Sequence, residues 1–201
     1  LVIDSFDELD RLEMYRGVAE PIRVMIRVTP GLEVHTFAEV QTGQVDSKFG
    51  FGWATGEAER ALHRVRSSPH LELIGLHVHI GSQVFSAANF ADAIHRIAPM
   101  ANDWAVPEFC VGGGLGVAYV NSEESATIAQ WGSAIRRACD SAGVTARVSA
   151  EPGRSIVARA GLTVYRVGTI KAIPGVREYV AVDGGMSDNP RPVLYGSGYE
   201  A

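Results

Sequence analysis

Short apolar runs alternate along this chain with longer segments in which apolar residues recur every three or four positions. The short runs are typical of buried strands, and the longer segments are typical of amphipathic helices. The expected strands are Leu1–Asp4, Arg23–Thr29, Leu73–Ile80, Glu108–Val111 and Arg147–Ala150. The expected helices start at a Ser5 capping box, at about Thr55, at Ser86 and at about Ser125. Strands that alternate with helices predict a parallel sheet.

The alternation changes after Gly161. Leu162–Val167 and Tyr179–Asp183 have the pattern of strands, with no helical segment between them. We therefore predict an α/β domain over residues 1–160 and the beginning of a C-terminal β-domain over residues 161–201. Within the first domain, the connection Pro30–Ala54 is much longer than the ~2–6 residues usual between a strand and a helix, which indicates a functional loop.

Three successive predicted strands end in glycine turns that carry polar residues. These segments are residues 76–83, 109–116 and 146–154, and the last ends in Glu151-Pro152-Gly153-Arg154. The sharp Pro-Gly turn is expected to leave a carboxylate and a guanidinium side by side. Taken alone, that pair fits an ordinary surface ion pair. Three neighbouring strand ends with anion-binding chemistry predict one shared site.

The glycines of residues 112–116 invite comparison with a dinucleotide-binding fold. The G-x-G-x-x-G pattern starting at Gly112 requires glycine at position 117, where Val117 stands, and no G-K-[ST] of a P-loop occurs. In a (β/α)8 barrel, by contrast, active-site groups come from the ends of several strands. We therefore expect a partial TIM-like barrel with about five of its eight strands. Because a whole barrel takes ~250 residues, the chain is expected to be a fragment.

Composition narrows the class of protein. Of 201 residues, 46% are hydrophobic and 20% are charged, which is typical of a globular protein, and the net charge of −5 argues against a nucleic-acid surface. No run approaches the ~18 apolar residues of a membrane span. Cys110 and Cys139 lie in apolar segments and are interpreted as reduced and buried, which suits a cytoplasmic protein. The six histidines are scattered without a metal-binding motif, so no metal is expected.

Four segments, in this order and spacing, resemble the fold-type III pyridoxal-phosphate decarboxylases, and among them the diaminopimelate decarboxylases. They are His79–Gln83, Gly112–Gly116, Glu151–Arg154 and Asp183–Pro192. The resemblance implies a pyridoxal 5'-phosphate cofactor, an amino-acid substrate, and a homodimer whose active sites are shared between subunits. It implies the removal of CO2 from meso-2,6-diaminopimelate to give L-lysine, the last step of lysine biosynthesis.

The resemblance implies catalytic roles for Glu151 and His79. Glu151 would face the pyridine nitrogen and keep it protonated, and His79 would stack on the cofactor ring. Arg154 would bind the phosphate or a substrate carboxylate as a planar fork, next to Pro152 and Gly153 in the cofactor site. The alternative for Glu151 is a simple ion pair with Arg154. His77 shares a strand face with His79, and is more readily interpreted as a hydrogen-bonded core histidine.

The cofactor phosphate would be bound by backbone N–H groups of the glycine turn and by the Ser82 hydroxyl. The four glycines are Gly112, Gly113, Gly114 and Gly116, where a Cβ would intrude on the phosphate. A bare tight turn would explain one or two of these glycines but not four in five positions. Cys110 departs from the family, in which an Asp commonly precedes the first glycine by two residues.

Arg191 and Tyr195 correspond to family residues that hold the distal end of the substrate. A guanidinium suits the second carboxylate of diaminopimelate, whereas a cationic distal end such as that of ornithine should prefer an acidic group. Asp188 nearby weakens this distinction, and a plain surface arginine is the alternative.

The family's Schiff-base lysine has no counterpart here, since Lys48 and Lys171 are the only lysines and neither matches its position. We therefore expect this chain alone to be inactive. Two alternatives stay open: a related decarboxylase acting on arginine, ornithine or carboxynorspermidine, and a non-catalytic relative. The family's cysteine-bearing segment is expected after Ala201.

Overall fold

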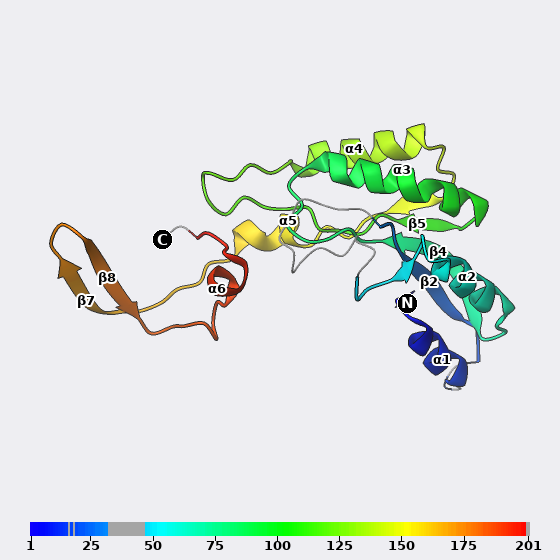
Figure 1. Cartoon of the computed structure of the whole chain (residues 1–201), viewed down its shortest axis with the longest axis horizontal. Helices are drawn as coiled ribbons and strands as arrows, with labels where there is room; N and C mark the ends of the chain where they lie inside the picture. The colour runs from blue at the N-terminus through cyan, green and yellow to red at the C-terminus, as the bar shows by residue number, and fades with distance from the viewer. Residues whose placement is uncertain (16, 18, 32–46, 200–201) are drawn as a thin grey trace.

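The computed structural model describes residues 1–15, 17, 19–31 and 47–199 (Figure 1). Its elements are β1 (Val2–Ile3), α1 (Phe6–Met14), β2 (Ile22–Thr29), β3 (Phe51–Gly52), α2 (Glu57–Ser67), β4 (Leu71–Val78), α3 (Ala87–Asp103), β5 (Glu108–Cys110), α4 (Ile128–Ser141), β6 (Arg147–Ser149), α5 (Arg154–Val157), the 3-10 turn Ala158–Ala160, β7 (Val167–Ile173), β8 (Arg177–Val182) and α6 (Arg191–Tyr195).

The main sheet is parallel, with the strand order β1-β2-β4-β5-β6. Each of these strands pairs with the next one along the chain, and helices connect them, as in a segment of a (β/α)8 barrel. The expected α/β class with a partial barrel is confirmed, and all five predicted strands form. A sixth, β3, was not predicted: it lies within the long connection after β2 and pairs with the end of β2. Of that connection, residues 32–46 lie outside the described residues.

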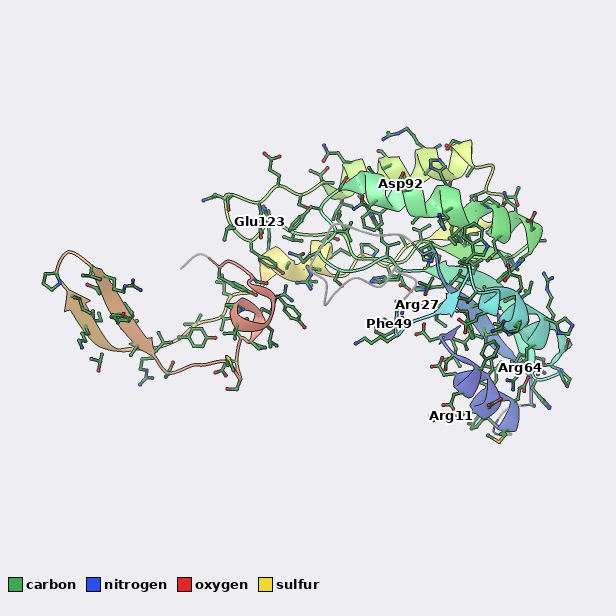
Figure 2. All side chains as sticks on the ribbon, viewed as in Figure 1. Arg11, Arg27, Phe49, Arg64, Asp92 and Glu123 are labelled. Carbon is green, nitrogen blue, oxygen red and sulfur yellow. The ribbon has the colours of Figure 1, made fainter. Side chains whose placement is uncertain are left out.

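The core lies between one face of the sheet and the helices that cover it. Ile26, Leu76 and Phe109 come from three neighbouring strands and are completely buried under this helical layer. Within this layer, Arg64 of α2 bonds to Asp10 and Glu13 of α1 at 2.5 and 2.6 Å and so connects the two helices (Figure 2). The opposite face of the sheet carries the polar side chains described below.

Side-chain caps set where the helices begin. The Ser5 hydroxyl accepts from the Glu8 amide at 3.3 Å, as predicted, but the Glu8 carboxylate reaches back to the Asp4 amide instead of that of Ser5. The helix expected from Ser125 begins three residues later, because Thr127 and Gln130 form a complete capping box.

The C-terminal part differs from the sequence prediction. The strand predicted at Leu162–Val167 is wrong: Leu162 is 93% exposed, and the strand β7 begins only at Val167. An alternating pattern forms a strand only where a partner completes the hydrogen-bond ladder, and here β7 finds that partner in β8. These two strands form a separate antiparallel hairpin, at the far end of the molecule from the main sheet (Figure 1).

Candidate active site

Three strand ends meet on the polar face of the main sheet. The register places His77 of β4 beside Cys110 of β5, which in turn lies beside Ser149 of β6. Two residues further along each strand, His79, Gly112 and Glu151 follow on the same face, since side chains alternate along a strand. The Glu151 amide donates to the Gly112 carbonyl at 2.8 Å. The structure therefore brings together the acid, the imidazole and the glycine cluster that the sequence singled out.

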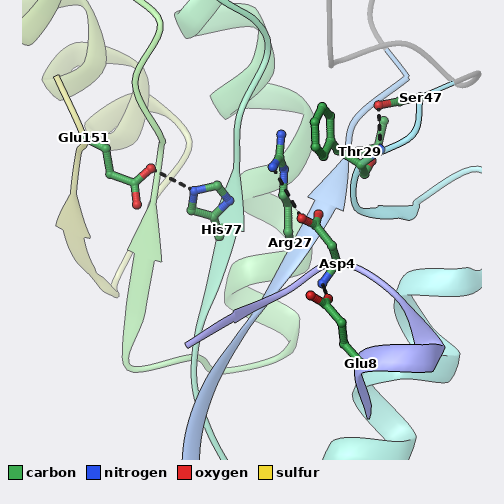
Figure 3. Close-up of polar contacts among 8 residues, drawn as sticks. Asp4, Glu8, Arg27, Thr29, Ser47, His77 and Glu151 are labelled. Atoms are coloured by element: carbon green, nitrogen blue, oxygen red, sulfur yellow. Dashed lines mark hydrogen bonds and ion pairs between the residues drawn. The ribbon is translucent and has the colours of Figure 1, made fainter. Parts of the chain in front are cut away.

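Glu151 is bound by a histidine and not by the expected arginine. Its Oε2 lies 3.0 Å from Nε2 of His77, and the carboxylate is about half exposed (Figure 3). Burial raises the pKa of this carboxyl, but the hydrogen bond and charge of His77 and the bond from Cys110 outweigh it and lower the pKa below its ordinary value. Glu151 is therefore an anion at neutral pH, with one side open to a ligand.

Arg154 does not lie side by side with Glu151 as an ion pair, contrary to the expected geometry of the Pro-Gly turn. The turn residues Pro152 and Gly153 lead directly into α5, and the Arg154 Nη1 donates to the Tyr119 hydroxyl at 3.0 Å. The Tyr119 ring is in turn stacked on Tyr199, with centroids 5.5 Å apart. Arg154 is thus held by the loop after β5, and its remaining donors are available to an anion.

His77 is a buried, hydrogen-bonded histidine, as the sequence suggested, and its partner is Glu151. Its side chain is only 5% exposed, and its Nε2 donates to the ionised Glu151. The Nδ1 atom is buried without a hydrogen-bond partner among the described residues. The two-residue spacing from His79 was the sequence signal, but only the strand register shows that His77 faces Glu151.

His79 is a neutral ring at the end of β4. Burial, together with the charges of Arg27 and His77, lowers its pKa to about 4. Its Nδ1 accepts from the Gly113 amide at 3.3 Å, which places the single ring proton of the neutral form on Nε2. An uncharged flat ring in this position can stack on an aromatic ligand.

The glycines of the turn allow three strand ends to pack closely. Gly112 and Gly114 have left-handed φ values of 71° and 101°. A Cβ at Gly112 would overlap the Val78 carbonyl, and one at Gly114 would overlap the Gly81 carbonyl. This requirement for glycine comes from neighbouring backbone, which is a different reason from the phosphate contact that the sequence suggested.

Two amides of the turn are already used within the protein. Gly113 donates to His79, and the Gly116 amide donates to the Val84 carbonyl at 2.9 Å. These two amides are therefore not available to a phosphate. A phosphate at this turn would have to be bound by other backbone amides of residues 112–116.

The loop after β4 is fastened to the glycine turn. The Gln83 amide side chain donates to the Val117 carbonyl at 3.1 Å and accepts from the Val117 amide at 3.0 Å. The Val84 amide donates to the Gly114 carbonyl at 3.0 Å. Ser82, a candidate phosphate ligand, lies half-buried in this fastened loop. The two loops therefore form one rigid wall of the site.

Arg27 of β2 is a site residue that the sequence analysis missed. Its side chain is 14% exposed, pairs with Asp4 at 3.6 Å, and lies over the Phe49 ring at 4.7 Å (Figures 2 and 3). Burial lowers its pKa, while the charges of Asp4 and Glu151 oppose that effect. An arginine between the apolar residues Ile26 and Val28 of a predicted strand was the available signal. It supplies the positive charge that faces Glu151 and His79.

Arg191 and Tyr195 lie on α6, apart from the strand ends. The Arg191 guanidinium lies over the Tyr195 ring at 5.5 Å and donates to the Ser197 hydroxyl at 3.4 Å. Within the part of the chain that the structure describes, neither residue bonds to Glu151 or His79. The Arg191 Nε is buried without a partner in that same part.

The two lysines lie in different parts of the molecule, and Lys48 contacts the same Phe49 ring as the site residue Arg27. Lys48 is exposed with its Nζ over the Phe49 ring at 5.1 Å, and Lys171 is exposed in the hairpin strand β7. Among the described residues, no helix is both long and apolar enough to span a bilayer.

Comparison with known proteins identifies the family. Residues 1–158 match the family described as pyridoxal-dependent decarboxylase, pyridoxal binding domain. The diaminopimelate decarboxylases of Bacillus subtilis and Actinosynnema pretiosum are 41% and 44% identical to this chain, over 100% and 99% of its length and 48% and 46% of theirs. The chain therefore spans about half the length of the curated relatives it matches.

Solved structures agree with this match. Diaminopimelate decarboxylase from Helicobacter pylori, complexed with L-lysine, superposes with a TM-score of 0.87 at 31% identity, covering 100% of this chain and 50% of that one. The enzyme from M. jannaschii, also in complex with L-lysine, gives 0.86 at 27% identity, covering 98% and 48%. With a parallel barrel segment and a carboxylate beside a neutral histidine at its strand ends, the chain belongs to the pyridoxal-dependent decarboxylase family.

Proposed function

We propose that the protein containing this chain removes CO2 from meso-2,6-diaminopimelate to give L-lysine, with pyridoxal 5'-phosphate as cofactor. The observation that carries the proposal is the His77–Glu151 pair at 3.0 Å, which keeps an ionised carboxylate beside the neutral ring of His79. The relatives at about 40% identity are diaminopimelate decarboxylases, which supports this substrate.

The site residues fit the cofactor. Glu151 is an anion with an open side and would accept a hydrogen bond from the protonated pyridine nitrogen, and the flat ring of His79 would lie on the pyridine face. The phosphate would be held by Ser82, by the glycine turn and by the turn Pro152–Gly153 with Arg154. The close packing at Gly112 and Gly114 keeps this wall of the site in place.

Each residue then has a distinct task in the reaction. When bound, pyridoxal phosphate accepts the electron pair that remains on the substrate α-carbon as CO2 leaves. Glu151 would keep a proton on the pyridine nitrogen, because His77 holds its carboxylate ionised. His79 would cover one ring face and, being uncharged, would not repel that proton. Arg27 of β2, which lies beside His77 in the sheet, balances the negative charge of Glu151.

Substrate recognition would fall to three residues. Arg191 and Tyr195 would contact the distal carboxylate, and Arg154 would contribute a second cationic group. The buried, unpartnered Nε of Arg191 supports this, because within the described residues that donor has no other acceptor.

We further propose how the chain is organised in the whole protein. Residues 1–160 form part of the cofactor-binding barrel, and residues 161–201 begin a β-domain. The protein would act as a cytoplasmic homodimer with shared active sites. Leu162 and Val164, 93% and 86% exposed, support further burial in the assembly, and the two free cysteines support a reducing compartment. The Schiff-base lysine would come from outside these 201 residues.

The test is a substrate panel on the full-length protein. CO2 release should be fastest from meso-diaminopimelate, compared with L-ornithine, L-arginine and carboxynorspermidine. Faster release from one of the other three would assign the chemistry to that substrate. Cofactor binding without CO2 release from any of them would identify a non-catalytic relative.

A further inference from the structure

Three potential metal ligands of different chemistry meet at the strand ends. A ring nitrogen of His77, Sγ of Cys110 and a carboxylate oxygen of Glu151 all lie within 4.8 Å of one another. They come from three neighbouring strands, with His77 and Cys110 in direct register. Because the ligands are 33 and 41 positions apart in the sequence, no motif of short spacing reveals them.

We propose that this cluster binds a zinc-class divalent cation when the cofactor is absent. Imidazole, thiolate and carboxylate are the ligands that zinc and cobalt prefer, whereas magnesium and calcium prefer oxygen alone. With bond lengths of about 2.0–2.3 Å, the ligand atoms of a tetrahedral zinc stand about 3.3–3.7 Å apart. The 3.0 Å between His77 and Glu151 is slightly shorter than this, and all three ligand atoms lie within 4.8 Å of one another, so small shifts of the side chains would complete the geometry.

The surroundings fit an open three-ligand site. His77 and Cys110 are buried and fixed by the sheet, while Glu151 is about half exposed and can adjust its position. The exposed side of Glu151 leaves a fourth coordination position for water, as in zinc sites with three protein ligands. The positive charge of Arg27 repels the cation, and the negative charge of its partner Asp4 weakens this repulsion. We therefore expect moderate affinity and not that of a closed structural site.

The cation and the cofactor would exclude each other. A cation bound to the Glu151 carboxylate would put a positive charge where the protonated pyridine nitrogen of the cofactor would lie, and the two positive charges would repel each other. This exclusion rests on the proposed function, whereas the metal site itself rests only on the three ligands.

Cobalt is the probe, because its spectrum reports both thiolate coordination and four-coordinate geometry. The untagged, cofactor-free full-length protein titrated with Co2+ should develop a near-ultraviolet thiolate-to-cobalt band and intense visible bands, which Zn2+ then abolishes. In Cys110→Ser the thiolate band should disappear, and zinc affinity should fall at least ~100-fold. Cys139→Ser is the matched control, since Cys139 is also buried but lies in α4, and it should keep the full spectrum.

The contrary results are equally definite. Absence of the thiolate band in the parent chain, or its persistence in Cys110→Ser, would overturn the proposal. Circular dichroism verifies the fold of each variant. Should Cys110→Ser fail to fold, the half-exposed Glu151→Gln decides, because unchanged zinc affinity in that variant also refutes the site.

A separate arm tests the exclusion. Pyridoxal phosphate added in excess should suppress the cobalt spectrum. A spectrum that is unchanged at saturating pyridoxal phosphate would refute the shared use of Glu151, whatever the result of the substrate panel.

Discussion

The imidazole of His77 and the carboxylate of Glu151 are 74 residues apart in the sequence, yet their Nε2 and Oε2 atoms lie 3.0 Å apart. The pairing follows from the sheet, because β5 separates β4 from β6 and contributes only the small Cys110 side chain at this level. A long histidine can therefore reach across one strand to the acid. This contact sets the charge of the residue on which the proposed chemistry depends.

Replacing His77 should impair the reaction through Glu151. His77→Phe keeps a flat ring of similar size but removes the hydrogen bond, so the pKa of Glu151 should rise. In the full-length enzyme kcat should fall roughly 10- to 150-fold, since a hydrogen bond to a charged group contributes roughly 1.5–3 kcal/mol. The acid limb of the pH profile of kcat should also move to higher pH, which a general loss of packing would not cause.

The control for this change is His95→Phe. His95 lies on α3 and bonds to Ser141 on the outer helical layer at 2.8 Å. This variant should leave the acid limb in place. A His77→Phe enzyme with an unmoved acid limb would show that His77 does not act through Glu151.

Tyr119 should position Arg154 for its anionic ligand. Tyr119→Phe removes the hydroxyl that accepts from Arg154 at 3.0 Å and keeps the ring that stacks on Tyr199. The freed guanidinium loses orientation, so KM for the substrate, or Kd for pyridoxal phosphate, should rise about tenfold. Steady-state kinetics measure the change in KM, and a cofactor titration measures the change in Kd. Tyr179→Phe on the exposed hairpin is the control. Equal KM and Kd values in the two variants would refute the role of Tyr119.

The sequence predicted the main sheet and the meeting of three strand ends, because alternation of strands and helices leaves little choice of topology. It did not predict the partner of Glu151. The Pro-Gly turn suggested Arg154 as its neighbour, but α5 begins at once and directs Arg154 to Tyr119. Register and loop direction arise from tertiary packing, and a local pattern does not contain them.

Two other differences have the same origin. Arg27 was overlooked because its charge lies within an apolar strand, and only the fold shows that it faces the site. Leu162–Val167 has the alternation of a strand, but among the described residues only its last position, Val167, pairs with another strand. The glycines were identified correctly as special positions, yet the backbone overlaps that require them depend on how three strands approach one another.

Acid should destabilise the chain partly through His79. Its pKa is about 4 in the folded chain and 6.5 ordinarily, so the unfolded chain binds the extra proton between these values. Above pH 6.5 His79 is neutral in both the folded and the unfolded chain and has no effect on stability. As the pH falls from 6.5 toward 4, the unfolding free energy decreases, by at most ~3 kcal/mol. Glu151, whose pKa is lowered from 4.5, contributes only at lower pH.

Urea unfolding at several pH values measures this effect. His79→Phe has no proton to bind, so its unfolding free energy should fall less than that of the parent between pH 6.5 and 4. His63→Phe is a suitable control, because His63 lies on the outer surface of α2 and should reproduce the pH dependence of the parent. Identical pH dependence in the parent and in His79→Phe would contradict the prediction.

Gly114 and Gly132 should respond oppositely to alanine. At Gly114 the φ of 101° is strained for alanine, and the added Cβ would overlap the Gly81 carbonyl, so Gly114→Ala should cost at least ~2 kcal/mol of unfolding free energy. At Gly132, inside α4, an added Cβ meets no atom within 4 Å, so Gly132→Ala should stabilise the chain by roughly 0.5–1 kcal/mol through helix propensity. Urea unfolding of both variants measures the difference.

Because the overlap lies between the loops after β4 and β5, Gly114→Ala should also weaken pyridoxal phosphate binding, while Gly132→Ala leaves it unchanged. Equal stability of the two variants would mean that the close approach of these loops is not required.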